Sequence, residues 1–358
     1  MSRVFVAMSG GIDSSLSAAL LKEEGYDVVG LFVAGWEDDF VGCQAKKDLE
    51  DVVSVCHVLS IPYYTIDLKK EFLKYVFDNF LEKLRQGLTP NPDISCNQHI
   101  KFRLLLERAL AMGGEFLATG HYCRLIRDEF GRARLLKGSD VNKDQSYFLH
   151  AVDSTSLAKV TFPVGDLKKS EVRSIAKSVG LMNFAKKDSV GICFVENKKF
   201  REFISHYIPT KKGLIISSEG NIMGEHHGLH LFTIGQRKGL RIGGKGSAWF
   251  VARKDVDTNT LWVVQGFDHP WLFASCFRIQ NVNWISQTPS FPFLCSVKVR
   301  YRSVEVSCRV ILFLDEIEVI LDTPVRAVTP GQSAVFYRGI ECLGGGIIRE
   351  IISDKHNY

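Results

Sequence analysis

The first 25 residues constrain the fold most, because they place a strand, a glycine-rich loop and a helix in immediate succession. Residues 4–8 are apolar and predict a buried strand, SGG follows at residues 9–11, and residues 14–24 have a helical pattern. Glycines let backbone N–H groups approach oxyanions closely, and a helix N-terminus adds positive potential. The segment therefore predicts a phosphate site, although it lacks the lysine of the G-x-x-x-x-G-K-[ST] motif. The alternative is an ordinary turn in which serine and aspartate only cap the helix.

Strand and helix patterns continue to alternate through the first half of the chain. Strands are predicted at residues 28–33, 63–66 and 116–119, and helices at residues 44–59, 70–85 and 100–111. This alternation favours a parallel sheet with helices on both faces. Ligands of such sheets bind at the carboxyl ends of the strands, where both AMSGGIDSS and the later ATGH lie.

The pattern changes near residue 205, where short alternating strands separated by turns replace the helices. Residues 254–266 predict a hairpin. Residues 295–313 alternate cleanly, which predicts one strand face with Val297, Val299 and Tyr301 and another with Lys298, Arg300 and Arg302. We therefore expect an α/β domain over residues 1–205, a small β-rich domain over residues 206–275 and a β-barrel over residues 276–358.

Composition excludes several classes of protein. No apolar run is long enough to span a bilayer and the strand pattern starts at once, so we expect no signal peptide, no membrane partner and a cytoplasmic location. Nine cysteines without a C-x-x-C pair argue against a disulfide framework and a zinc ribbon. The net charge is +5, and residues 186–212 hold seven Lys or Arg against three acids. That stretch is either a solvated face or a contact surface for phosphate backbones.

A second informative stretch, TPNPDISCN at residues 89–97, places two prolines before a predicted helix. Asp93 and Cys96 stand three residues apart at its start. A helix N-terminus lowers the pKa of a thiol, and a carboxylate can act as a general acid or base. Alternatively, Asp93 or Ser95 caps the helix and Cys96 packs in the core. The sequence leaves both interpretations open.

A third stretch, KKDSVGICF at residues 186–194, puts Cys193 in an apolar run beside basic residues. In isolation a buried strand cysteine is the simpler interpretation. If Cys96 and Cys193 meet in one cleft beside an ATP loop, however, the pair indicates sulfur transfer. One thiol would carry a persulfide, and the other would accept or resolve it by disulfide exchange.

The loop SGGIDS matches the S-G-G-x-D-S signature of the PP-loop ATP pyrophosphatases. Enzymes of that superfamily adenylate an oxygen of the substrate and release pyrophosphate, and amidating, lysidine-forming and sulfur-inserting enzymes share the loop. The ordered blocks TPNPDISCN, ATGHY, NKDQSYFL, DSVGICF, GQRKGL, VRYR, TPGQSAVFY and CLGGGII make nearly the whole chain resemble the tRNA-specific 2-thiouridylase family. This resemblance implies an adenine-nucleotide α-hydrolase-like domain with a parallel sheet, a small β-rich central domain and a C-terminal β-barrel that contacts tRNA.

The resemblance also implies roles for single residues. ATP would be bound by Ala7, Met8, Ser9, Gly10, Gly11, Ile12, Asp13 and Ser14, with Val33 and Gly120 at the adenosine. Asp13 could also position Mg²⁺ on the phosphates. The target base would contact Asn91, Pro92 and Asp93, Cys96 would be the nucleophile, and Cys193 would carry the persulfide. Contacts to tRNA would come from His121, Lys143, Asp144, Gln145, Arg300, Tyr301 and Gln332.

Some of these residues have simpler interpretations, and the chain departs from the family pattern in three places. Lys143 and Arg300 could be only solvated, and Gln332 could only shape a turn. Ala7 stands where Gly is frequent and Val190 where Thr is frequent, and the chain is shorter near residues 244–248 than in many relatives. None of these departures removes a catalytic group.

The expected reaction is thiolation of the wobble uridine in the tRNA anticodon loop. The uridine C2 oxygen attacks the α-phosphate of Mg-ATP, and Asp93 helps to move protons. Sulfur from a cysteine desulfurase or a sulfur carrier protein arrives as a persulfide on Cys193. It reaches C2 by direct attack, or as hydrosulfide after Cys96 attacks the persulfide and leaves a Cys96–Cys193 disulfide. The rival interpretations are an amidating PP-loop ligase and a tRNA-binding protein with a vestigial nucleotide loop.

Overall fold

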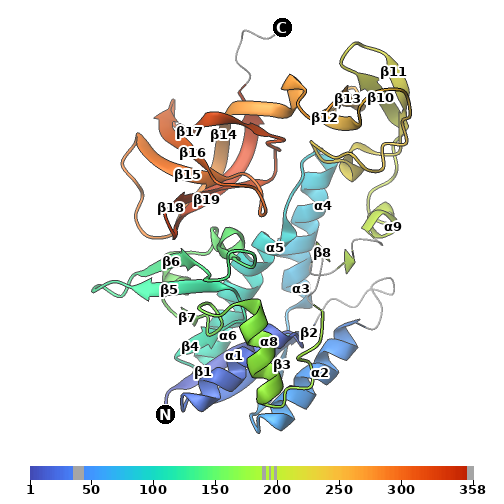
Figure 1. Ribbon diagram of the computed structural model, residues 1–358. Coiled ribbons are helices and arrows are strands. Elements are labelled where there is room, and N and C mark those ends of the chain that lie inside the picture. The colour runs from blue at the N-terminus through green and yellow to red at the C-terminus, as the bar shows by residue number, and fades with distance from the viewer. Residues whose placement is uncertain (35–43, 188–190, 193–194, 197–199, 353–358) are drawn as a thin grey trace.

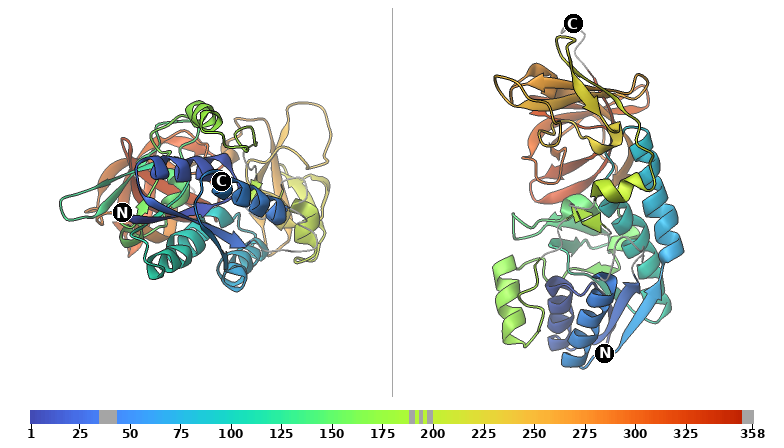
Figure 2. Two further views of the ribbon diagram at one scale, coloured as in Figure 1. Left: turned by 90° about the horizontal axis from the view of Figure 1, so that it is seen from below. Right: turned by 90° about the vertical axis from the view of Figure 1, so that its right-hand side faces the viewer.

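The structure is a computed structural model that describes residues 1–34, 44–187, 191–192, 195–196 and 200–352. It consists of an N-terminal α/β domain, a small β-rich domain and a C-terminal barrel (Figure 1). The right-hand view of Figure 2 shows the α/β domain at one end and the two β domains at the other. The predicted fold class is confirmed. Among the described residues, no helix is long and apolar enough to cross a membrane.

The N-terminal sheet is parallel, with the strand order β3-β2-β1-β4-β7. Its strands are β1 (Arg3–Met8), β2 (Asp27–Ala34), β3 (Tyr63–Asp67), β4 (Phe116–Ala118) and β7 (Val160–Thr161). Alternate side chains of β1 enter two different cores: Phe5 packs in one, and Val4 and Val6 pack in the other. The central strand is therefore buried on both faces, which explains its uninterrupted apolar sequence.

Helices cover the sheet and extend from it. They are α1 (Ile12–Glu23), α2 (Gln44–Val58), α3 (Lys69–Phe72), α4 (Asp78–Arg85), α5 (Pro92–Ser95), α6 (Leu106–Ala111), α7 (Ser154–Leu157), α8 (Lys169–Ser178) and α9 (Phe200–Ser205). Wider π-helical turns at Leu73–Phe77 join α3 to α4, and others at Cys96–Leu105 join α5 to α6. Two long helical stretches result, and the one that ends in α4 reaches the β domains (Figure 1).

The small central domain is a four-stranded sheet in the order β11-β10-β13-β12. Its strands are β10 (Gly213–Ser217), β11 (Ile222–His226), β12 (Trp249–Asp255) and β13 (Thr260–Gln265). The β12–β13 pair is antiparallel, so the hairpin predicted at residues 254–266 is confirmed, although its first strand begins earlier. A two-stranded pair, β8 (Gly191–Ile192) and β9 (Val195–Glu196), precedes α9.

Six antiparallel strands form the C-terminal barrel. They are β14 (Phe273–Trp284), β15 (Phe293–Lys298), β16 (Val306–Phe313), β17 (Glu316–Arg326), β18 (Ser333–Arg338) and β19 (Glu341–Ile351). Pairing between β14 and β19 closes the barrel. Strand β19 also pairs with β6 (Ala133–Lys137), which forms a hairpin with β5 (Cys123–Arg127). This hairpin ties the barrel to the α/β domain, and the sequence analysis did not identify it.

The alternation predicted across residues 295–313 is wrong at its centre. Strand β15 ends at Lys298, and a turn follows before β16 begins. Val297 and Val299 are buried as expected, but Arg300 and Tyr301 lie in the turn rather than on strand faces. The turn is closed by hydrogen bonds between Arg300 and Ser303. Apolar alternation alone does not reveal this turn, because it contains neither Gly nor Pro.

All three domains meet at Thr89, just before the TPNPD segment. The Thr89 N–H donates to Pro330 O at 3.1 Å, and the Gln332 side-chain amide donates to Thr89 O at 2.6 Å. From the central domain, Lys254 Nζ reaches Thr89 Oγ1 at 3.4 Å and Phe232 O at 2.9 Å. Burial lowers the pKa of Lys254 to about 8. The segment that leads to Cys96 is therefore anchored to both β domains.

Candidate active site

Three chain segments meet at the carboxyl edge of the N-terminal sheet, because β1, β2 and β4 are parallel neighbours. They are the loop after β1, the end of β2 with Val33, and the residues after β4 with Gly120. Gly120 packs so tightly against the start of α1 that an added Cβ would lie 2.6 Å from the Asp13 carbonyl carbon. A glycine at this position thus brings the β4 loop against the glycine-rich loop.

Serine hydroxyls organise the loop between β1 and α1. Ser14 Oγ donates to Gly11 O at 3.0 Å and accepts from the Ser9 N–H at 3.2 Å. The Gly11 N–H meets Ser9 Oγ at 3.3 Å, at the long end of hydrogen-bond distances. No side chain caps α1, and its N-cap residue is Gly11. The predicted alternative, in which serine and aspartate only cap the helix, is therefore wrong, and the first N–H groups of α1 face the loop.

Gly10 adopts a left-handed backbone with φ of +70°, and α2 approaches it closely. A Cβ on Gly10 would lie 2.6 Å from the backbone oxygen of Asp48. Backbone atoms cannot move away as a flexible side chain does. Both the conformation and the space at this position therefore require glycine.

Gly10→Ala is expected to destabilise the protein and to remove nucleotide binding. The left-handed conformation alone costs about 1–2 kcal/mol for alanine, and the clash with Asp48 adds to that cost. The matched control is Gly25→Ala, because Gly25 has φ of +88° and, apart from its chain neighbours, no atom of the described residues lies within 4 Å of its Cβ position. Thermal unfolding and nucleotide titration compare the two variants. Equal stability and equal nucleotide affinity in both variants would contradict this account of the loop.

Asp13 is held by two groups from distant parts of the chain. Lys169 Nζ lies 2.7 Å from Asp13 Oδ1 and 2.8 Å from Oδ2, and the Tyr122 hydroxyl donates to Oδ1 at 2.7 Å. Lys169 is the first residue of α8, and its side chain is 11% exposed. A lysine from another element thus stands beside a loop that has none of its own. No sequence spacing links Lys169 to Asp13, so the sequence analysis missed it.

Asn91 caps the helix that carries Cys96. Its Oδ1 accepts a hydrogen bond from the Asp93 N–H at 3.1 Å, and Pro92 occupies the first helical position. Neither Asp93 nor Ser95 is the N-cap residue, so that part of the structural alternative is wrong. Cys96 is 7% exposed and belongs to the same core cluster as Ile94. The other part of the structural alternative, that Cys96 packs in the core, is therefore observed, one turn inside the helix.

Cys193 lies outside the described residues, so the expected meeting of Cys96 and Cys193 stays a prediction. Two residues before this segment do contact the loop. Asn183 Nδ2 and Lys186 Nζ both donate to Gly10 O, each at 3.1 Å. Like Lys169, these residues were not among the predicted site residues. Their only sequence signal is that both precede Cys193 by ten residues or fewer, and that Lys186 begins the basic stretch of residues 186–212.

Comparison with known families gives three matches along the chain. They are a tRNA methyl transferase HUP domain over residues 2–197, a tRNA methyl transferase PRC-barrel domain over residues 201–265 and an aminomethyltransferase beta-barrel domain over residues 274–348. The tRNA-specific 2-thiouridylase MnmA of Geobacillus thermodenitrificans is 49% identical, with 98% of this chain and 95% of that protein covered. The chain belongs to the tRNA-specific 2-thiouridylase family.

Other 2-thiouridylases support the assignment, and a match among solved structures is more distant. The MnmA protein of Bacillus subtilis is 47% identical over 98% of this chain and 96% of its own length. Among solved structures, the U34-tRNA thiolase NcsA of Methanococcus maripaludis is 19% identical, with a TM-score of 0.35 over 57% of this chain and 64% of that chain. A likeness at this level assigns no function.

Two residues that the 2-thiouridylase resemblance assigns to tRNA, Asp144 and Gln145, are engaged within the α/β domain and its contact with the barrel. Asp144 is buried, accepts from the N–H groups of Gly138 and Ser146, and lies 3.5 Å from Lys298 Nζ. Gln145 Oε1 accepts from the Tyr122 N–H at 3.0 Å. These hydrogen bonds hold nearby backbone segments of the protein in place. The contacts of Asp144 and Gln145 with RNA therefore stay a prediction.

His121 lies directly after Gly120 at the carboxyl edge of the sheet. Its Nδ1 is 2.8 Å from Thr119 Oγ1, and its ring packs against Phe102 and Phe162. Burial, with a smaller effect of Lys101, holds the pKa of His121 well below its usual value. The imidazole is therefore neutral at physiological pH. A neutral ring contacts a base by stacking or by one hydrogen bond rather than by charge.

The barrel residues predicted to contact tRNA hold the domains together in this structure. Arg300 donates to Ile234 O at 2.7 Å and to Thr329 Oγ1 at 2.6 Å, and burial lowers its pKa. The Tyr301 ring packs on Phe148 with 4.3 Å between centroids. The side chains of Gln332 and Lys143 are half-buried, and Gln332 binds Thr89 as described above. The interpretation of Arg300 as only solvated is therefore wrong.

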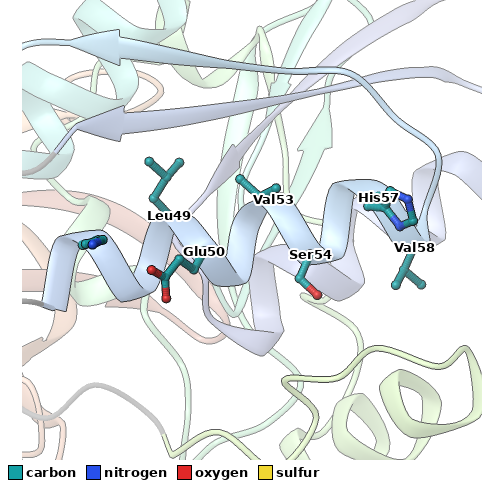
Figure 3. A pocket seen from close by; sticks show the side chains of 7 residues that line it. Leu49, Glu50, Val53, Ser54, His57 and Val58 are labelled. Atoms are coloured by element: carbon teal, nitrogen blue, oxygen red, sulfur yellow. The ribbon is translucent and has the colours of Figure 1, made fainter.

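A shallow hollow of about 560 Å³ lies on α2, away from the predicted site residues. Figure 3 shows Leu49, Val53 and Val58 along this helix together with Glu50, Ser54 and His57. None of the residues that line it belongs to the glycine-rich loop or to the Cys96 helix. The hollow therefore does not form part of the candidate active site.

Proposed function

We propose that the chain is an ATP-dependent tRNA sulfurtransferase that replaces the C2 oxygen of the wobble uridine with sulfur. The observation that carries the proposal is the loop of residues 9–14, formed at the carboxyl edge of the sheet in a chain 49% identical to a named 2-thiouridylase. Its glycines leave backbone N–H groups accessible, and α1 points its N-terminus at the same place. This loop supports nucleotide binding independently of the relatives' names.

ATP fits this site as a substrate. Apart from the chain neighbours of Gly11, Ser9 Oγ is the one atom of the described residues within 4 Å of its Cβ position, so the loop leaves room for phosphate oxygens. Ser9 and Ser14 supply hydroxyls, and Lys169 supplies the positive charge that the loop itself lacks. The residues from Ala7 to Ser14 would hold the phosphates, and Val33 and Gly120 would flank the adenosine.

Mg²⁺ fits this site only as an ion held mainly by ATP. Asp13 is its one proposed protein ligand, and both oxygens of that carboxylate already contact Lys169. Within the described part of the chain, no three His, Cys, Asp or Glu side chains are grouped as a metal site. Mg²⁺ bound with ATP would neutralise phosphate charge. The chemistry described below rests on the protein side chains.

Each step of the proposed reaction uses a different group of residues. The extruded uridine contacts Asn91, Pro92 and Asp93, and its C2 oxygen attacks the α-phosphate and expels pyrophosphate. Asp93 moves the protons. Sulfur from the Cys193 persulfide then displaces AMP from C2 by one of two routes. In one route Cys96 attacks the Cys193 sulfur, leaves a Cys96–Cys193 disulfide and frees hydrosulfide, which attacks C2. In the other the persulfide attacks C2 directly, and a thiol, from Cys96 or from solution, then cleaves the S–S bond between Cys193 and the thiolated base. Because Cys96 is only 7% exposed, tRNA binding has to uncover its thiol.

The partners follow from this chemistry. The tRNA anticodon loop is the substrate, and its contacts come from His121, Lys143, Asp144, Gln145 and the barrel turn with Arg300 and Tyr301. Several of these side chains also hold domains together. RNA binding to them would therefore change contacts between the domains as well as cover the protein surface. A cysteine desulfurase or a sulfur carrier protein supplies the persulfide sulfur. The enzyme acts in the cytoplasm, where its tRNA substrate resides.

A single reaction tests this function. Purified protein is incubated with Mg-ATP, a tRNA transcript with a wobble uridine and sulfide, and nucleosides and nucleotides are measured by mass spectrometry. We expect 2-thiouridine and AMP in equal amounts. AMP without thiouridine would retain the ATP chemistry and favour an amidating ligase or another acceptor. Bound tRNA without either product would favour the binding-protein interpretation.

A further inference from the structure

The Gly10 carbonyl is the meeting point of two side chains from residues that precede Cys193. Asn183, which is 8% exposed, donates to Gly10 O through Nδ2 and also to Ser15 Oγ at 2.9 Å. Lys186 Nζ donates to the same carbonyl. One loop oxygen therefore accepts two hydrogen bonds from a segment that lies more than 170 residues away in the sequence.

These two bonds fix the direction of the next N–H group. The only cis peptide among the described residues is Phe291–Pro292, so the Gly10–Gly11 peptide is trans. In a planar trans peptide the C=O and N–H point in opposite directions. With Gly10 O turned toward Asn183 and Lys186, the Gly11 N–H points away from them, toward Ser9 Oγ and the space beside it. A peptide flip would aim a carbonyl at the phosphates instead.

We propose that Lys186 and Asn183 are positioning residues that clamp the Gly10–Gly11 peptide in the orientation that binds an anion. The proposal rests on the proposed function of the loop. It also connects the loop to the part of the sequence that leads to Cys193, the proposed persulfide carrier. Lys186 lies seven residues before Cys193 (193 − 186).

Charged partners on α2 hold the Lys186 end of the clamp. Lys186 Nζ lies 2.8 Å from Asp48 Oδ1 and 2.5 Å from Asp51 Oδ2. Burial opposes the charge of Lys186, but the hydrogen bonds and the charges of these two aspartates raise its pKa above the usual value. The lysine therefore stays protonated and can donate to the carbonyl and to both carboxylates at once. The backbone of Asp48 also packs against Gly10, so α2 contacts both Lys186 and the glycine that this lysine holds.

The test measures binding of the ATP analogue α,β-methylene-ATP to the full chain by calorimetry. Lys186→Met is expected to weaken binding about tenfold, because the glycine peptide then samples both orientations. Lys186→Arg is expected to restore most of the affinity, since a guanidinium can also donate to the carbonyl. The matched control is Lys187→Met, which neutralises an exposed neighbouring lysine and is expected to leave the affinity for the analogue unchanged.

A second variant separates the clamp from simple loss of stability. Asp51→Asn removes one ion-pair partner of Lys186 but leaves its bonds to Gly10 O and Asp48, so it is expected to bind the analogue within about twofold of wild type. Equal affinity of wild type and Lys186→Met would overturn the clamp and leave the proposed function standing. Equal losses in Lys186→Met and Asp51→Asn would overturn it as well. A wild-type protein that does not bind the analogue would overturn both proposals.

Discussion

Cys96→Ser is expected to lower 2-thiouridine formation by about a thousandfold or more, the size of effect seen when a nucleophile is removed. A serine hydroxyl stays protonated at neutral pH and is a poor nucleophile toward a persulfide. The ATP loop is formed by other residues, so tRNA-dependent pyrophosphate formation should remain measurable, whereas AMP, which leaves only when sulfur attacks C2, should fall together with 2-thiouridine. Single-turnover reactions with a persulfide donor, with both products quantified, check this prediction.

The control for Cys96→Ser is Cys56→Ser, because both thiols are buried and both variants bury an extra hydroxyl. Cys56 packs in the core on the other face of the sheet, with Val52 and Val55. Similar losses of thermal stability with thiolation lost only in Cys96→Ser would assign the chemistry to Cys96. Thiolation above a tenth of the wild-type rate in Cys96→Ser would favour direct attack by the Cys193 persulfide, with a thiol from solution rather than residue 96 cleaving the S–S bond that remains to Cys193.

Lys169→Met is expected to lower the rate of AMP formation by about 10²- to 10³-fold, as for the loss of one charge-stabilising donor in an active site. Negative charge moves onto the departing pyrophosphate in this step, and the Lys169 ammonium is the cation that the structure places at Asp13. The effect should appear mainly in kcat, because the loop N–H groups still bind ground-state ATP. Steady-state kinetics with pyrophosphate detection measure both constants.

The control is Lys168→Met, which removes the same charge at the start of the same helix. Lys168 directly precedes Lys169, but its side chain is exposed. It should keep wild-type kinetics. Lys169→Arg should recover part of the rate, since a guanidinium retains the charge but not the geometry. A Lys169→Met enzyme with a wild-type kcat would show that the lysine serves only to neutralise Asp13.

Local patterns predicted the parts of the site that are close in sequence. The strand–loop–helix at residues 3–23 was predictable because a continuous apolar run, glycines and helix periodicity all act within about 20 residues. The start of the Cys96 helix followed from the prolines of TPNPD. The N-cap role of Asn91 was missed because Asn, Asp and Ser all suit that position and all three occur there.

Local sequence patterns do not predict contacts between residues that are far apart in the sequence. Lys169 meets Asp13 across 156 residues, and Lys186 meets Gly10 O across 176 residues. Lysine doublets are usually solvated, and no periodicity marks the member that turns inward. The same limit applies to Asp144, whose position between the α/β domain and the barrel depends on the β6–β19 pairing. Resemblance to a family named residues but did not show that several of them hold domains together.

The most direct measurement of the central claim is the fate of the uridine C2 oxygen. The complete reaction is run in H₂¹⁸O with Mg-ATP, tRNA transcript and a persulfide donor, and AMP and 2-thiouridine are analysed by mass spectrometry. Adenylation of the uridine predicts equal amounts of 2-thiouridine and of AMP without ¹⁸O, because the oxygen added to AMP comes from the base. AMP that carries ¹⁸O from water, or thiouridine formed without AMP, would contradict the account.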